Sequence, residues 1–160
     1  MTGAGPLRRV AQAALVAGLL ATCGGARATL GEPASSIARV QALLQGGHRI
    51  ALSASTHYQV HVITLADGSA IREFVGPSGI VFAVSWSTRL KPRLDALLGA
   101  HAMPYRAAAS AALVAPGVRH RASVATGDLV VEAHEHANAH SGIAYLRSLV
   151  PEGVRLDELR

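Results

Sequence analysis

The sequence predicts an α+β domain in which an antiparallel β-meander of about four to six strands carries two or three helices packed on one face. Three observations predict it. Apolar residues recur at helical spacing over residues 33–45, and again over residues 91–99. Between these segments, residues 48–86 alternate with a period of two and break at tight-turn signals. Short turns of this kind join neighbouring strands that run antiparallel.

The first 28 residues have the pattern of a secretory signal peptide. Arg8 and Arg9 precede an apolar run of about 13 residues, and a small-residue cleavage site ends at Ala28. The apolar run is shorter than the roughly 20 residues that a membrane-spanning helix needs. We therefore expect signal cleavage after Ala28, leaving a single domain over residues 29–160. This mature chain is expected to lack a transmembrane segment and to be exported to the periplasm or the outside of the cell.

A lipoprotein signal, with Cys23 as the lipidated residue, is the alternative for the same segment. It is the weaker interpretation because Thr22 precedes the cysteine, where Gly or Ala fits better. Cys23 is the only cysteine in the sequence. The expected mature domain therefore has neither disulfides nor thiol chemistry and is held together by its core.

The charge of the expected mature chain argues against nucleic acid as a partner. The formal net charge is +5, but three of the 15 basic residues and none of the ten acidic ones lie in residues 1–28, so it falls to +2 after cleavage. Nucleic-acid binding needs a basic stripe that neutralises several phosphates, and the remaining basic residues are scattered.

The first half of the expected domain begins with a helix over residues 33–45, started by Pro33 and stopped by Gly46-Gly47. Four strand-like runs then follow, at residues 48–54, 57–65, 69–75 and 79–86. Asp67-Gly68 fits a two-residue type I′ turn. Gly76-Pro77-Ser78-Gly79 fits a type I turn with Pro at its second position.

The second half has weaker signals. A leucine stripe predicts a helix over residues 91–99, with Pro104 as a stop. Residues 106–115 are alanine-biased and compatible with a helix, and residues 116–127 have the character of an exposed basic loop. A strand over 128–133 is expected to pair with one over 141–146, and residues 156–160 to form a short helical turn.

Arg72 and Glu73 place two charges within one of the strand-like runs, and the register of the hairpin decides what they face. With a two-residue loop at Pro77-Ser78, Glu73 lies opposite Phe82, in the apolar core. With Gly79 as a bulge after the turn, Arg72 lies opposite Val84 on the aromatic face and Glu73 lies on the other face. Gly79 is well placed for the bulge, which we therefore favour.

Either register brings one charge toward apolar surroundings, where an unpaired charge is costly. An internal ion pair or an Arg72 side chain that extends to water is the simpler explanation. A ligand site built on Arg72 or Glu73 is the alternative.

Three histidines, His134, His136 and His140, suggest a metal site in the segment HEHANAH. On a strand, His134 and His136 share a face, together with Glu132, and a looping His140 adds a third ligand. A solvated turn is the competing interpretation of the segment, since its spacing differs from that of the helical H-E-x-x-H motif.

No catalytic constellation is evident in the sequence. A G-x-S-x-G elbow is absent, and no glycine-rich loop joins a strand to a helix in the manner of a phosphate cradle. We therefore expect a protein without enzymatic activity and without a cofactor.

Several stretches together resemble one protein family. They are residues 29–36 (TLGEPASS), Tyr58-x-Val60-His61, Asp67-Gly68, residues 72–75 (REFV), Pro77 with residues 79–86 (GIVFAVSW), Leu94-x-x-Leu97-Leu98-Gly99, Ser141-Gly142-x-Ala144-Tyr145 and Pro151-x-Gly153-Val154. This combination resembles the DUF2844 family of exported bacterial proteins of unknown function, over residues 29–160. The resemblance implies no catalytic residue, cofactor or substrate. In the segment after Leu97-Leu98-Gly99, where the family is often rich in aromatic residues, only Tyr105 fits.

The favoured interpretation is therefore an exported envelope protein that acts as a non-enzymatic binding or assembly module. Its partner is an envelope protein or a small ligand. The alternative is a small-ligand or metal-binding periplasmic protein that uses the 134–140 histidines or the Arg72/Glu73 region.

Overall fold

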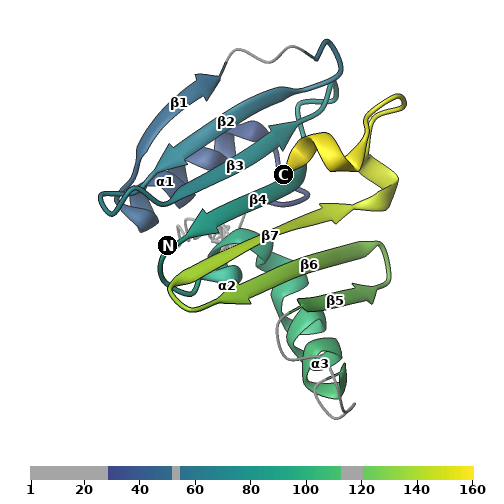
Figure 1. Cartoon of the computed structure of the whole chain (residues 1–160). Helices are drawn as coiled ribbons and strands as arrows, with labels where there is room; N and C mark the ends of the chain where they lie inside the picture. The colour runs from purple at the N-terminus through teal and green to yellow at the C-terminus, as the bar shows by residue number, and fades with distance from the viewer. Residues whose placement is uncertain (1–28, 52–54, 113–120) are drawn as a thin grey trace, which may run out of the picture.

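The computed structural model describes residues 29–51, 55–112 and 121–160, which form one seven-stranded antiparallel sheet (Figure 1). The strands are β1 (Gly47–Ala51), β2 (Gln59–Thr64), β3 (Ala70–Val75), β4 (Val81–Thr88), β5 (Arg121–Thr126), β6 (Leu129–His136) and β7 (Ala139–Leu146). Their order in the sheet is β1-β2-β3-β4-β7-β6-β5. Two meanders, β1 to β4 and β5 to β7, therefore meet where β7 pairs with β4. The expected α+β class with an antiparallel sheet is confirmed, with one strand more than the expected upper limit.

The helical segments are short. They are η1 (Ala34–Ser36), α1 (Ile37–Leu44), α2 (Leu94–Leu98), η2 (Gly99–His101), α3 (Ala102–Ala112), η3 (Arg147–Leu149) and η4 (Leu156–Leu159). The helices expected over 33–45 and 91–99, and the turn expected at 156–160, are all present. None of the helices in the described ranges is long and apolar enough to span a membrane.

β5 replaces most of the described part of the loop expected over residues 116–127. It pairs with β6 from Arg121↔His134 to Thr126↔Leu129, across a two-residue turn that includes Gly127 with φ +57°. Small residues dominate this strand, so its sequence carries little of the apolar alternation that reveals a strand.

α3 includes Pro104, which the sequence suggested as a stop. The helix begins at Ala102, so Pro104 lies in its first turn. The N–H groups of a first turn have no partner within the helix, and proline is tolerated there because it removes no hydrogen bond. Proline at this position is thus part of the helix start.

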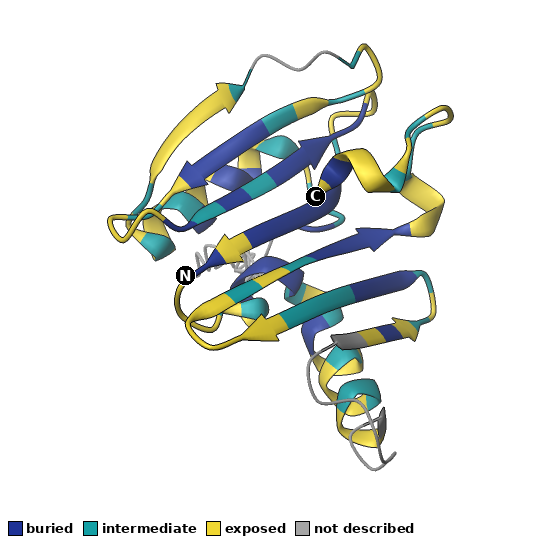
Figure 2. Cartoon of the chain, viewed as in Figure 1, coloured by how far each residue is buried: buried dark blue, intermediate teal, exposed yellow. Residues whose placement is uncertain are grey.

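The helices cover one face of the sheet and bury a continuous core. Ile37 and Val40 of α1 and Leu97 and Leu98 of α2 are at most 2% exposed. They pack on the side chains that β2, β3, β4, β6 and β7 direct to this face. Figure 2 shows the buried residues concentrated on the central strands, with β4 buried along most of its length.

The opposite face is covered over one part by residues 150–160, here called the final segment. Leu159 of η4 is fully buried against the sheet, and Val150, Val154 and Leu156 pack around it. Phe74 and Phe82 meet Tyr58 beneath this segment, with Tyr58 and Phe74 ring centres 5.6 Å apart. Figure 1 shows the final segment on the side of the sheet opposite α1 and α2.

The β2–β3 turn differs from the expected type I′ geometry. Gly68 has a φ of +82°, but Asp67 does not have the positive φ that a type I′ turn also requires. Gly68 N donates to Leu65 O at 3.0 Å, which is the hydrogen bond of a type I turn followed by a glycine bulge. The Asp67 carboxylate accepts hydrogen bonds from Ser69 N and Oγ, both at 2.9 Å, and so stabilises this geometry.

The β3–β4 turn has the expected glycine bulge. Gly79 has a φ of +76°, and Gly79 N donates to Gly76 O at 2.9 Å. Next to the turn, Val75 pairs with Val81, which is the register that the bulge predicts.

A second irregularity follows immediately and shifts the register by one residue. Phe74 pairs with Ala83, so Phe82 is an extra residue on β4. Beyond it, Arg72 pairs with Ser85 and Glu73 with Val84. The expected pairing of Arg72 with Val84 is therefore wrong, because the sequence carries no glycine or other signal for this second bulge.

Candidate functional site

The shifted register places Arg72 and Glu73 on opposite faces of the sheet. Glu73 faces the helices and is fully buried, whereas Arg72 is partly exposed on the face that the final segment crosses. No ion pair between the two is possible across the sheet. The alternatives that the sequence left open are resolved in this way: Glu73 enters the core, and Arg72 shares the aromatic face.

Glu73 is a carboxyl group held in the core by one hydrogen bond. Thr29, which is also fully buried, donates its hydroxyl to Glu73 Oε1 at 2.5 Å. Oε2 is buried without a hydrogen-bond partner in the described part of the chain. Burial raises the pKa of Glu73 to about 7, against the smaller opposing effect of the Thr29 hydroxyl. Close to neutral pH this carboxyl group is therefore poised between its neutral and its charged form.

A line of imidazoles leads from the sheet edge toward Glu73. His61 of β2 is the register partner of Glu73, and its Nδ1 lies 3.1 Å from Nε2 of His48 on β1. The two imidazole rings stack with centroids 5.2 Å apart. His61 Nε2 is buried without a partner among the described residues. Burial, and secondarily the charge of His48, lower the pKa of His61, so a neutral ring is favoured there.

The second polar feature is a hollow of about 350 Å³ on the opposite face, beside the final segment. Its volume is at the lower end of the range typical of small-molecule sites. Its floor is formed by β4, β7 and β6 and by Arg72 of β3. Its polar side chains are Arg72, Ser85, Ser87, Glu132, His134, Ser141 and Arg160.

Two groups in this hollow have unused hydrogen-bonding capacity. Arg72 has no hydrogen bond or ion pair with any residue in the described ranges. Its register partner Ser85 is 2% exposed, and Ser85 Oγ is buried without a partner in the same ranges. A buried polar group without a partner costs free energy. A ligand atom that bonds Arg72 and Ser85 together would remove that cost.

The other charges of the hollow largely neutralise each other. Arg160 of the final segment donates to Glu132 Oε2 on β6 in a close ion pair. With this pair neutralised, Arg72 supplies an excess positive charge, and His134 adds an imidazole ring. The hollow therefore suits a small ligand that carries a negative charge and hydrogen-bond acceptors.

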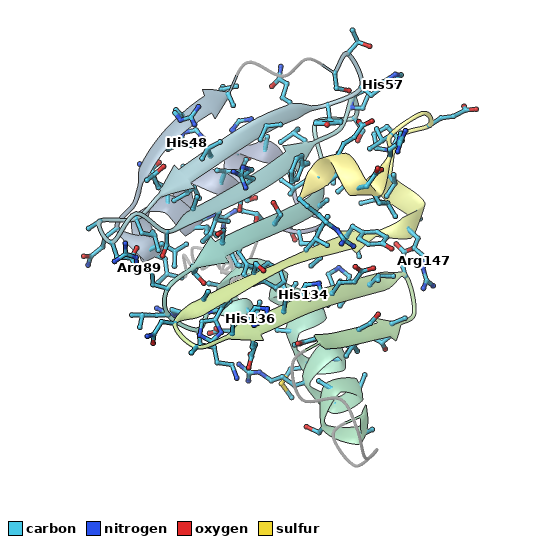
Figure 3. All side chains as sticks on the ribbon, in the orientation of Figure 1. His48, His57, Arg89, His134, His136 and Arg147 are labelled. Carbon is cyan, nitrogen blue, oxygen red and sulfur yellow. The ribbon has the colours of Figure 1, made fainter. Side chains whose placement is uncertain are left out.

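The three histidines of HEHANAH do not converge on one point. The segment forms the ends of β6 and β7, with Asn138 at φ +60° in the turn between them. Alternation along β6 puts His134 and His136, both labelled in Figure 3, on the same face as Glu132. Glu132 and His134 line the hollow. His140 pairs with Glu135, so alternation along the strands directs it to the opposite face.

No group of three metal-ligating side chains occurs in the described ranges. His140 therefore does not join His134 and His136 as expected. The two-residue turn pairs His136 with Ala139, so the next residue, His140, points to the opposite face of the sheet. Glu132, the expected companion of His134, is engaged by Arg160.

Several residues of both sites were not identified from the sequence. Thr29, Ser85 and Arg160 are single polar residues without a motif, and they reach their sites through long-range contacts. The His48–His61 pair was accessible in principle, because pairing β1 with β2 antiparallel brings both residues to one face. The segment expected to be a signal peptide, with the expected cleavage site at Ala28 and the alternative lipidation site at Cys23, lies outside the described residues.

Fold and site together define a class: an α+β domain whose antiparallel sheet is covered by helices on one face and bears a polar hollow on the other. The chain matches the family described as "Protein of unknown function (DUF2844)" over residues 26–159, and it belongs to this family. Comparison with curated proteins and with solved structures gave no match.

Two contacts join the stretches on which the family resemblance rests. Thr29, of the first stretch, holds Glu73 of the REFV stretch. Gly142, of the SGIAY stretch, lies directly against the indole of Trp86. The first contact therefore fixes the N-terminal end of the described chain to β3. The second fixes β7 against β4, where the two halves of the sheet meet.

Proposed function

We propose that this chain is an exported, non-enzymatic binding module of the cell envelope, and that its ligand occupies the hollow around Arg72. The observation that carries the proposal is that Arg72 and the buried hydroxyl Ser85 Oγ, neither of which has a partner among the described residues, line one concave site. Buried polar groups are normally satisfied, so an exception in a hollow points to a missing partner.

The ligand class follows from the donors. A guanidinium group binds a carboxylate or phosphate group through parallel hydrogen bonds, and a serine hydroxyl donates one more. The volume of about 350 Å³ limits the ligand to a small molecule or to the anionic end of a larger one. We therefore infer a ligand with a carboxylate, sulfate or phosphate group.

The proposed lack of enzymatic activity is supported by the positions and partners of two carboxyl groups near the hollow. Glu132 is engaged by Arg160, and Glu73, whose pKa is suited to proton transfer, lies on the other face of the sheet. His134 in the hollow thus has no free carboxylate partner among the described residues that line it. Export is supported by the signal-like residues 1–28.

The test is binding of small anions at constant ionic strength. Citrate, sulfate and phosphate are titrated against the protein, and the shift in melting temperature is compared with that given by chloride. A ligand that binds the folded state raises the melting temperature. We expect one of these anions to do so. Loss of a charge-assisted hydrogen bond in Arg72→Gln weakens its binding roughly 10- to 100-fold.

Arg89→Gln is the matched control, since Arg89 is exposed and does not line the hollow. Equal weakening by both substitutions would show nonspecific charge attraction and contradict the proposed site. If none of the anions raised the melting temperature, this result would also contradict the proposed site.

Assembly through the sheet edge is a second candidate function. Within the described part of the chain β1 pairs only with β2, and Ile50 on this strand is 60% exposed. An edge strand with an exposed apolar residue can accept a partner strand, here β1 of a second copy. Light scattering of the purified protein tests it. A dimer that Ile50→Lys converts to a monomer supports assembly, and a monomeric wild-type chain contradicts it.

A further inference from the structure

Thr29 is held in the core by the fold itself. Its carbonyl oxygen accepts a hydrogen bond from Glu32 N at 2.9 Å, and the next residue but one, Gly31, donates to Val81 O at 2.8 Å. The side chain donates to Glu73 Oε1. The position of Thr29 is thus fixed by contacts with residues that follow it in the sequence.

The Thr29 hydrogen bond and covalent geometry together place the backbone nitrogen of Thr29 within about 6.3 Å of Glu73 Oε1. Covalent geometry keeps this nitrogen within about 3.8 Å of Oγ1 of the same residue, and Oγ1 is 2.5 Å from Glu73 Oε1. The second carboxyl oxygen, Oε2, is buried and lacks a partner in the described ranges. A positive charge on this nitrogen would therefore lie within about 6.3 Å of a buried acid that has an unused acceptor.

We propose that Glu73 is the receptor for the amino terminus that signal cleavage creates at Thr29. The inference rests on the export proposed above. Hydrolysis of the Ala28–Thr29 peptide bond by a signal peptidase consumes one water molecule, leaving a carboxylate on Ala28 and an amine on Thr29. This amine takes up a proton at neutral pH and pairs, as an ammonium group, with the ionised carboxylate of Glu73.

No other described group that faces Glu73 supplies a comparable counter-charge. From β2 it is faced by His61, with His48 of β1 behind, and the opposing residue of β4 is Val84. The buried side chains of α1, Ile37 and Val40, carry no charge. Before cleavage the Thr29 nitrogen is a neutral amide, so cleavage introduces the charge that an ionised Glu73 lacks. Cleavage is accordingly expected to stabilise the folded mature chain through this ion pair.

The sequence offers an unusually direct readout, because the mature chain contains two primary amines. One is the α-amine of Thr29, and the other is the side chain of Lys91, the single lysine of the sequence, which is exposed. At pH 7 an exposed α-amine has the larger unprotonated fraction, by on the order of a hundredfold, because its pKa is near 8 and that of lysine near 10.4. Acetylating reagents should therefore modify an exposed terminus first.

The experiment expresses the full 160-residue chain in a bacterial host and determines the first residue of the envelope-fraction protein by mass spectrometry. The purified protein is then acetylated at pH 7. We expect a chain beginning at Thr29 in which Lys91 is modified first, and in which the α-amine reacts only after unfolding in urea. A chain that begins elsewhere overturns the inference. So does a native Thr29 amine that reacts before Lys91, although export then stands.

Two variants separate the ion pair from simple burial. In Glu73→Gln the acceptor charge is removed at nearly constant size, and we expect the native α-amine to become at least tenfold more reactive. A chain that begins at Ala28 places the ammonium group one residue away from the acid, and its α-amine should react before Lys91. Near-ultraviolet circular dichroism of Trp86 verifies folding in each case. Equal protection in all three chains would contradict the pairing.

Discussion

Arg72 and Glu73 are neighbours in sequence, yet one faces solvent in a polar hollow and the other is fully buried beneath helices. Alternation along a strand separates them, and the extra residue Phe82 determines which of them enters the core. An ionised carboxylate in such a core is unfavourable unless it is paired. The free energy of the fold is therefore sensitive to the protonation of this single group.

Because Glu73 loses its proton as pH rises, the uncleaved chain is expected to become less stable. The unfolded side chain loses its proton near pH 4.5, whereas the folded one keeps it to about pH 7. Between these values the folded state binds more protons, so the free energy of unfolding falls with rising pH. The difference corresponds to about 3 kcal/mol. Urea unfolding from pH 4.5 to 7.5, on a chain in which Ala28 still precedes Thr29, measures it.

Glu73→Gln is the reference for this measurement, because it retains His61. Burial lowers the pKa of His61, so the contribution of His61 to the free energy of unfolding decreases as pH falls. The difference between the two pH profiles removes this contribution and isolates Glu73. Parallel profiles for the two chains would show that the Glu73 pKa is not raised.

Replacement of Gly142 is expected to destabilise the fold. A Cβ atom there would overlap the Trp86 indole and the carbonyl oxygen of Glu132. Forcing extra volume into a packed site costs roughly 1–3 kcal/mol, so Gly142→Ala should lower the free energy of unfolding by about that amount. Gly47→Ala is the control, since a Cβ at Gly47 meets nothing closer than Thr64 O at 3.9 Å. Equal effects of the two substitutions in chemical denaturation would contradict the packing.

At the scale of elements, the final segment covers the aromatic cluster on the face of the sheet opposite the helices. It is short and largely irregular, yet it buries Leu159 completely against the aromatic cluster. It also delivers Arg160 to the rim of the hollow. One element thus completes the packing of this face and shapes the candidate site.

Leu159→Ala should therefore be strongly destabilising, although the residue is next to last in the sequence. Truncating a fully buried leucine costs about 2–5 kcal/mol. Leu90→Ala is the matched control, because Leu90 is 76% exposed and its truncation should change stability by less than about 0.5 kcal/mol. Thermal or urea unfolding compares them. A loss below about 1 kcal/mol for Leu159→Ala would show that the final segment is not packed on the sheet.

The elements that the sequence predicts well are those with a strong local pattern. α1, α2 and the strands β2 to β4 have regular apolar periods and turn residues, and all are present. β5 was missed because its residues are small, and the start of α3 was misplaced because a proline in a first turn resembles a stop. The second bulge in β4, at Phe82, has no local signal such as a glycine, and Phe82 packs in the cluster of the opposite face.

At the scale of the whole molecule, the sheet separates two chemical environments. The helix-covered face holds a buried acid, two imidazoles and the entering chain at Thr29. The other face holds the hollow and its excess positive charge. Such long-range groupings depend on strand order. The expected pairing of the strands at 128–133 and 141–146 is confirmed as β6 with β7, but the pairing of β7 with β4 is not encoded in any local pattern. For this reason Arg72 and Glu73 were predictable as candidates, but their partners were not.

The sorting of Arg72 and Glu73 to opposite faces is the claim on which both proposals depend, and thiol labelling tests it most directly. The sequence has one cysteine, Cys23, which lies in the segment expected to be removed. Cysteine is introduced singly by Arg72→Cys and by Glu73→Cys into the chain that begins at Thr29. In the native state the thiol at position 72 should react readily with a maleimide, whereas the thiol at position 73 should react only on unfolding. Equal reactivity at the two positions, or the reverse order, would contradict the register and both proposed sites.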